Sequence, residues 1–156
     1  MTEFHLPNDL LYNRGAIQDP SAYAKEVGSS SWLFLVGDEF ASMPQGMSYA
    51  QVQDAVPSSA RVVSDPPRIL DLHLARQHVD ALDRLPRPTL ISCRTGPRAS
   101  AVAYMYAGLK LGAAPEEVLA AAEREDAPFS AFVELREWVR SSMESLRESG
   151  SGEPPP

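Results

Sequence analysis

A short apolar strand that leads into a tight turn and then a helix is the feature that most constrains how this chain folds. Residues 88–92, with the sequence PTLIS, are typical of a buried strand. A helical pattern begins near Ala99, and the loop between the two, residues 93–98, reads CRTGPR. In layered α/β folds with parallel strands, sites form at the carboxyl ends of the strands. Cys93 falls at such an end.

The loop 93–98 combines the residue types of a thiolate and anion site. Its turn and the following helix N-terminus are expected to direct backbone N–H groups at one spot, which lowers the pKa of a cysteine and makes it a nucleophile. Arg98 supplies a planar fork for an oxyanion. A lone cysteine is often only a small buried hydrophobic residue, but the glycine and two arginines around Cys93 favour an anion site. The candidate anion-binding residues beside Cys93 and Arg98 are Arg94, Thr95, Gly96, Pro97, Ala99 and Ser100.

Charge and cysteine content limit the partners of the chain. The net charge is −7, which argues against nucleic acid as a partner, whereas Arg94 and Arg98 leave room for a small anionic or phosphorylated substrate. No apolar run is long enough to span a membrane, and residues 1–5 do not resemble a signal peptide, so no membrane partner is expected. A single cysteine fits a reducing compartment, and we predict a cytoplasmic protein.

The pattern along the chain alternates strands with helices. We predict strands at 31–36, 60–64 and 89–92 and helices at 21–27, 49–56, 72–85, 99–111 and from 115 onward. Asp71 is expected to cap the helix at 72, and Gly112 to end the helix at 111. A last helix is predicted with an apolar stripe of Phe132, Leu135, Val139, Met143 and Leu146. This order predicts an α/β fold with a mostly parallel sheet flanked by helices.

Its length of 156 residues favours one domain. We place that domain at 31–146, with residues 1–30 as an extension of uncertain structure packed on it, extended or irregular up to about residue 18. Residues 147–156, rich in Gly, Ser and Pro, are predicted to form a disordered tail.

Two segments outside the loop resemble the dual-specificity phosphatases. The stretch 112–119, GAAPEEVL, is similar to the G-x-x-x-E-E-A-L motif that follows the active loop of that family, and 62–66, VVSDP, to the strand and aspartate that carry its general acid. The resemblance covers roughly residues 32–143. It implies a phosphatase-like three-layer fold with only helices after the cysteine loop. A rhodanese-like sulfurtransferase, which also places a cysteine this way, would need a further strand there.

The length of the loop indicates a different family. Dual-specificity phosphatases carry His-Cys-x5-Arg, whereas here Ser92 precedes Cys93, four residues separate Cys93 from Arg98, and Ala99 stands at the family arginine. Cys-x4-Arg is the rhodanese length. The chain resembles the beta-lactamase hydrolase-like protein family, whose phosphatase-like domains combine a Cys-Arg-Ser-Gly-x-Arg-Ser loop with the same helices.

That resemblance implies roles for several residues in phosphoester hydrolysis. The Cys93 thiolate would attack phosphorus to form a phospho-cysteine, and Arg98 with the loop amides would hold the oxygens. Asp65 would be the general acid, or only a turn residue of the Asp-Pro-Pro segment. Ser100 would donate to the leaving thiolate, or face solvent in the first helical turn. Arg94 would lie in solvent or at the rim of the substrate-binding site.

Two other functions remain open from the residues. In a sulfurtransferase or persulfide carrier, Cys93 would carry the sulfur and Asp65 would have no catalytic task. The third possibility is a module that binds an anion without catalysis. The early position of Arg98 and Ser92 in place of the family histidine would then indicate that catalytic activity has been lost.

No metal or other cofactor is predicted, because His5, His73 and His78 lack ligand spacing; we place His73 and His78 at surface or amphipathic positions of their helix. Trp32 and Trp138 are expected in the core. The sequence leaves the oligomeric state open.

Overall fold

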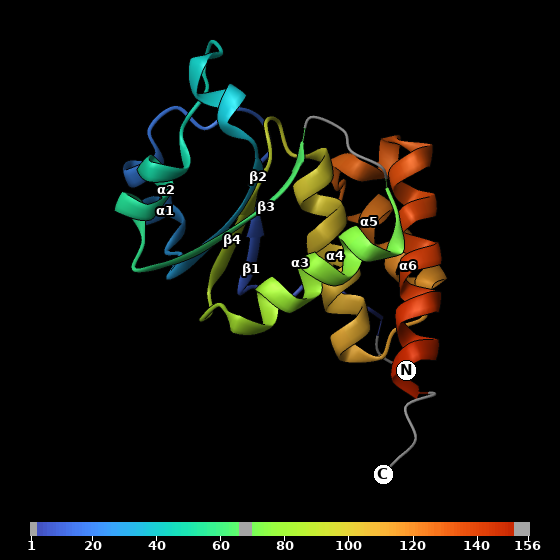
Figure 1. Ribbon diagram of the computed structural model, residues 1–156. Helices are drawn as coiled ribbons and strands as arrows, with labels where there is room; N and C mark the ends of the chain where they lie inside the picture. Colours follow the sequence, from blue (N-terminus) through green and yellow to red (C-terminus); the bar gives the residue numbers. More distant parts are fainter. Residues whose placement is uncertain (1–2, 66–69, 152–156) are drawn as a thin grey trace.

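The chain folds into three layers around a parallel sheet (Figure 1). The computed structural model describes residues 3–65 and 70–151, including all their side chains except those of residues 65 and 148–151. Within these residues four strands form one sheet in the order β1-β4-β2-β3, with every pair parallel. The strands are β1 (Leu10–Tyr12), β2 (Ser31–Val36), β3 (Ser58–Asp65) and β4 (Thr89–Ser92). The predicted α/β class with a parallel sheet is confirmed.

Helices cover both faces of the sheet (Figure 1). One face carries α1 (Pro20–Val27) and α2 (Tyr49–Ala55), and the other carries the remaining four helices. These are α3 (Leu72–Arg84), α4 (Pro97–Leu111), α5 (Pro115–Arg124) and α6 (Val133–Ser151), with short 3-10 turns at η1 (Asp38–Ser42) and η2 (Pro128–Ala131). All the described elements after β4 are helical, as the phosphatase resemblance implies.

Local capping explains where several helices begin and end. The carboxylate of Asp71 accepts a hydrogen bond from the backbone N–H of Leu74 at 2.9 Å, which confirms its predicted capping of α3. Gly112 ends α4 with a φ of 71°, a left-handed conformation that glycine adopts without a Cβ clash. Such signals lie within a few residues of one another and can therefore be read from sequence.

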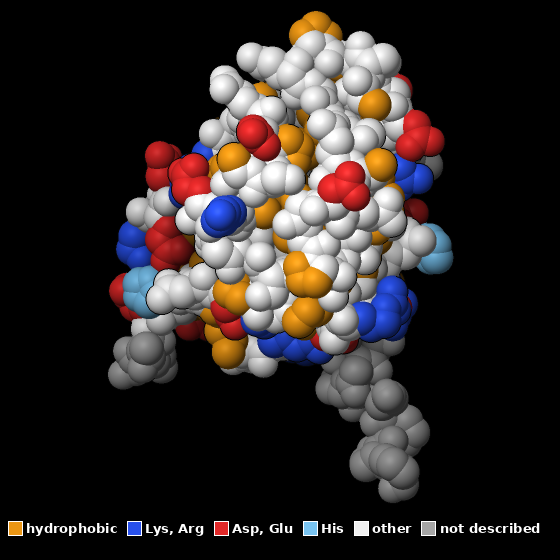
Figure 2. Space-filling model, turned by 90° about the vertical axis from the view of Figure 1, so that its left-hand side faces the viewer, with side chains coloured by type: hydrophobic (Ala, Val, Ile, Leu, Met, Phe, Trp, Pro, Cys, Tyr) orange, Lys and Arg blue, Asp and Glu red, His pale blue; other side chains and the backbone are white. Residues whose placement is uncertain are grey.

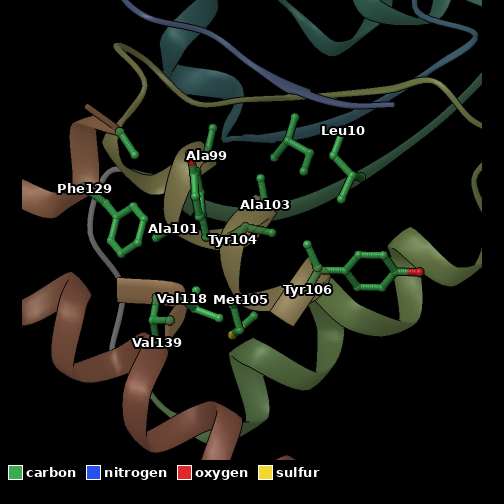
Figure 3. Close-up of a cluster of buried hydrophobic side chains, with 14 of the residues drawn as sticks. Leu10, Ala99, Ala101, Ala103, Tyr104, Met105, Tyr106, Val118, Phe129 and Val139 are labelled. Carbon is green, nitrogen blue, oxygen red and sulfur yellow. The ribbon is translucent and has the colours of Figure 1, made fainter. Parts of the chain in front are cut away.

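The hydrophobic core lies on both sides of the sheet. All residues of β2 are buried; Leu33 and Leu35 pack with α3–α6, whereas Trp32 and Phe34 pack with α1 and α2. Helix α4 is the centre of the larger cluster, because every residue from 98 to 108 is buried. Figure 3 shows Ala99 and Ala103 near the sheet residue Leu10, with bulkier side chains of α4, α5 and α6 packed below.

The small side chains of Ala99 and Ala103 let the first turns of α4 pack closely against the sheet. Trp138 is buried in the same cluster, so the predicted core positions of both tryptophans are confirmed.

The N-terminal segment adds a strand to the sheet. Residues 10–12, predicted to be extended or irregular, form edge strand β1 and pair with β4 in the register Leu10↔Thr89. Three residues are too few to show a hydrophobic period, so only the pairing partner reveals the strand. The segment 1–30, expected as an extension, thus supplies a strand of the sheet and helix α1.

The C-terminal helix and the histidines bring further differences. Phe132, placed on the apolar stripe, ends η2 just before α6 and is 49% exposed. The backbone of α6 continues through Ser151 into the predicted tail, of which residues 152–156 lie outside the described part. His78, expected at a surface or amphipathic position, is fully buried; it shares the inner face of α3 with Leu74, Ala75 and Leu82.

The described residues offer neither a metal-binding cluster nor a membrane-spanning helix. No group of three or more His, Cys, Asp or Glu side chains in 3–65 and 70–151 is arranged to hold a metal ion. In the same part of the chain, no helix has the length and apolar character needed to cross a membrane.

Candidate active site

The loop after β4 places two backbone amides on the sulfur of Cys93. Cys93 is buried, and its Sγ accepts hydrogen bonds from the N–H of Gly96 at 3.1 Å and of Ala99 at 3.3 Å. Because Ala99 lies in the first turn of α4, the sulfur also lies close to the positive end of that helix. Donors and a helix N-terminus both favour the charged form of a thiol, so the loop is built to stabilise a thiolate or another anion at this point.

Gly96 is the residue that makes this turn possible. Its φ of 118° lies in a region that side chains with a Cβ rarely adopt. A Cβ at this position would also lie 2.2 Å from the backbone oxygen of Asn13. The close approach of two backbones and the positive φ therefore both require glycine here. Pro97 follows as the first residue of α4, where its missing N–H costs no helical hydrogen bond.

Arg98 connects the loop to the end of β3. The side chain is buried, with 7% exposed, and its guanidinium donates a hydrogen bond to the backbone oxygen of Ser64. Ser64 directly precedes Asp65, so the predicted anion-binding arginine and the backbone of the predicted general acid lie at the same edge of the sheet. The side chain of Asp65 and residues 66–69 lie outside the described part of the chain.

The serines on either side of the loop make hydrogen bonds within the protein interior. Ser100 is buried rather than facing solvent; its hydroxyl donates to the backbone oxygen of Pro97 at 2.8 Å and accepts from the N–H of Phe129 at 3.1 Å. It thereby fastens η2 to the first turn of α4. Ser92 accepts a hydrogen bond from the Trp32 indole at 2.8 Å.

Among the other candidates, Thr95 accepts a hydrogen bond through its backbone oxygen from the N–H of Gly15, and Arg94 is half-buried.

His78 lies beside Arg98 and was not predicted as part of this region. Its Nε2 is 3.3 Å from the hydroxyl of Ser64, and its ring forms a T-shaped pair with Trp138 at a centroid distance of 5.7 Å. Burial, and secondly the charge of Arg98, lower the pKa of His78 to about 3. The imidazole is therefore neutral near neutral pH. The signal that could have revealed its burial is its place on the apolar face of α3 at 74, 75, 78 and 82.

Asn13 is the second residue that sequence analysis missed. It is buried, and its carboxamide contacts the backbone of Cys93 from a position 80 residues earlier in the chain. Nothing in the neighbouring residues signals this contact, which depends on the pairing of β1 with β4.

Structures of known phosphatases share this arrangement of strands and helices. The chain superposes on a mutant form of Tk-PTP with a TM-score of 0.70 and 16% sequence identity, and the match covers 94% of this chain and 97% of that chain. The fold is phosphatase-like. The core catalytic domain of the PP-IP phosphatase SIW14 from S. cerevisiae gives a TM-score of 0.61 at 15% identity, covering 97% of this chain and 94% of that one. PTPMT1 gives a TM-score of 0.66 at 9% identity, and the match covers 97% of this chain and 100% of that one.

These comparisons extend to the fold and no further, because the identities are low. A scan against models of protein families and a search of curated proteins find no match to the chain. The resemblance to protein tyrosine phosphatase-like folds is thus confirmed, while the finer resemblance to the beta-lactamase hydrolase-like family stays a prediction.

Proposed function

We propose that this chain is a cysteine-dependent phosphatase that hydrolyses a phosphoester through a phospho-cysteine at Cys93. The observation that carries the proposal is the convergence of the Gly96 and Ala99 amides on the Cys93 sulfur, in the same loop that carries the buried Arg98. A thiolate held this way is ready to attack phosphorus, and the same donors can hold the phosphoryl oxygens.

The reaction proceeds in two steps. In the first, the Cys93 thiolate forms a bond to phosphorus while the bond to the ester oxygen breaks, and the carboxylic acid of Asp65 gives that oxygen its proton. In the second, water attacks the phospho-cysteine, the Asp65 carboxylate takes a proton from the water, and phosphate leaves with return of the thiolate. Arg98 and the loop amides hold the negative charge that develops on the phosphoryl oxygens in both steps.

The substrate in this proposal is a small phosphorylated molecule. SIW14 is named a PP-IP phosphatase, and PTPMT1 is known in complex with PI(5)P. Figure 2 shows that the face formed by α1 and α2 carries acidic and basic side chains in scattered positions, without a continuous basic surface. That face, together with the net charge of −7, speaks against a polyanion such as nucleic acid. A reducing compartment, in which Cys93 stays reduced, suits the mechanism, and we place the protein in the cytoplasm.

Sulfur transfer is the second candidate, because only four residues separate Cys93 from Arg98. In that reaction Cys93 would accept the outer sulfur of a donor such as thiosulfate, with release of sulfite, and pass it from the persulfide to cyanide as thiocyanate. The loop amides would stabilise the persulfide anion, and Asp65 would have no task.

Parallel turnover assays distinguish the two functions. Wild type and Cys93→Ser are assayed with p-nitrophenyl phosphate in one series and with thiosulfate plus cyanide in the other. Phosphate release that depends on Cys93 supports the proposal, whereas thiocyanate alone would support sulfur transfer. Activity in neither series would leave an anion-binding module. If phosphate is released, Asp65→Asn tests the general acid, with the exposed Asp54→Asn as its matched control.

A further inference from the structure

The segment 13–15 lies against the candidate loop and contacts it at three places. The carboxamide of Asn13 accepts a hydrogen bond from the N–H of Cys93 at 3.2 Å and donates to the backbone oxygen of Cys93 at 3.0 Å. The N–H of Gly15 donates to the backbone oxygen of Thr95 at 2.7 Å. The backbone oxygen of Asn13 packs against Gly96, where it leaves no space for a Cβ.

Asn13 replaces a strand partner where the sheet ends. The pairing of β1 with β4 reaches Tyr12↔Ile91, and beyond it Cys93 turns away into the loop. Buried backbone groups need hydrogen-bond partners, and a carboxamide offers a donor and an acceptor in one planar group. The same amide group of Asn13 also donates to the backbone oxygen of Gly15 at 2.8 Å, which fixes the side chain in its own segment. Asn13 is 1% exposed, so water does not compete for these bonds.

One peptide group transmits the effect of this segment to the sulfur. The peptide between Thr95 and Gly96 is trans, so its C=O and N–H point in opposite directions. Its oxygen accepts from Gly15, and its N–H therefore points at the Cys93 sulfur, 3.1 Å away. If this peptide rotated, the carbonyl oxygen would face the sulfur and disfavour a thiolate or any other anion. The contact with Gly15 thus selects the anion-binding orientation.

The segment is also held from its outer side. The guanidinium of Arg14 donates to the backbone oxygens of Asp126 at 2.6 Å and Glu125 at 3.2 Å, just after α5. The segment is therefore bonded to the loop on one side and, through Arg14, to the C-terminal end of a packed helix on the other.

We infer that Asn13 is a positioning residue, which keeps segment 13–15 against the loop so that the Thr95–Gly96 peptide presents its N–H to Cys93. This inference deepens the proposed function by assigning the element that holds its nucleophile in the reactive form. It concerns the ionisation of Cys93 itself and can therefore be tested without turnover.

The test is the rate of alkylation of Cys93 by iodoacetamide as a function of pH, which follows the thiolate because Cys93 is the one cysteine in the chain. In Asn13→Ala, the inflection of the profile moves to higher pH, and the rate well below the inflection falls about tenfold for each unit of that movement. Asn13→Asp keeps the volume but replaces the donor with an acceptor, and moves the inflection in the same direction. The exposed Asn8→Ala is the matched control and leaves the profile unchanged.

Thermal unfolding of each variant separates lost positioning from lost folding. If the Asn13 variants do not fold, Arg14→Gln loosens the same segment from its exposed end and moves the inflection by a smaller amount. Folded Asn13 variants with the wild-type profile would overturn the inference, whatever their phosphatase activity. A moved inflection in a protein that hydrolyses no phosphoester would support the inference and refute the proposed function.

Discussion

The Nε2 atom of His78 lies 3.3 Å from the hydroxyl oxygen of Ser64, and the carbonyl of the same serine accepts a hydrogen bond from Arg98. A buried imidazole on α3 is thus linked through the end of β3 to the arginine of the candidate site. Burial and the charge of Arg98 keep this imidazole neutral, because protonation would place a second positive charge in the core.

The first prediction concerns the acid stability that His78 controls. Burial and the charge of Arg98 hold the pKa of His78 at about 3, far below the ordinary 6.5 of the unfolded chain. As the pH falls from 6.5 toward 3, the unfolded state binds a proton that the folded state does not. The free energy of unfolding should therefore decrease by up to about 1.4 kcal/mol per pH unit for this group.

Urea unfolding between about pH 5 and pH 6.5 measures this slope, above the range in which carboxylates titrate. His78→Gln should flatten the dependence, while the exposed His73→Gln should retain it. A slope that His78→Gln leaves unchanged would show that another group sets the acid stability.

The second prediction concerns the backbone of the loop. Gly96→Ala places a Cβ 2.2 Å from the Asn13 oxygen at a φ of 118°. We expect it to lower the free energy of unfolding by about 1–3 kcal/mol and to weaken binding of inorganic phosphate. Gly112→Ala is the matched control, because its φ is also positive at 71° but nothing lies within 4 Å of the added Cβ. Equal losses in the two variants would argue against a role of the Asn13 contact.

The third prediction separates the two arginines of the loop. Arg98→Lys replaces a buried planar fork by a point charge and should lower kcat for p-nitrophenyl phosphate about 100- to 1000-fold. Arg94→Lys, at a half-buried position, should lower it far less. Competitive inhibition by inorganic phosphate should weaken in the same order. Similar losses in the two variants would mean that Arg98 is not the main oxyanion ligand.

The fourth prediction concerns the residue before the nucleophile. The indole N–H of Trp32 donates to the hydroxyl of Ser92, and both side chains are fully buried. Trp32→Phe and Ser92→Ala should each lower the free energy of unfolding by about 1–3 kcal/mol, because each leaves the other, buried polar group without its hydrogen-bond partner. In a double-mutant cycle measured in urea, the pair should show a coupling of about 1 kcal/mol. Additive effects would show that this hydrogen bond does not stabilise the fold.

How much of the molecule could be predicted depends on the distance between the interacting residues. Asp71 and Leu74, or Gly112 and the helix before it, are neighbours in sequence, and their capping was predicted correctly. The burial of His78 was missed although its helical spacing carried the signal. Strand β1 was missed because three residues show no period and its only evidence is the partner strand.

The sequence by itself determined the local form of the loop, because the strand, the cysteine, the glycine and the helix N-terminus are contiguous and act through the local backbone. Only the tertiary structure decided what surrounds the loop. Asn13 meets Cys93, and Ser64 meets Arg98, across 80 and 34 residues of chain. Such contacts depend on which strands pair and which helix faces meet, and no local preference of the backbone encodes them.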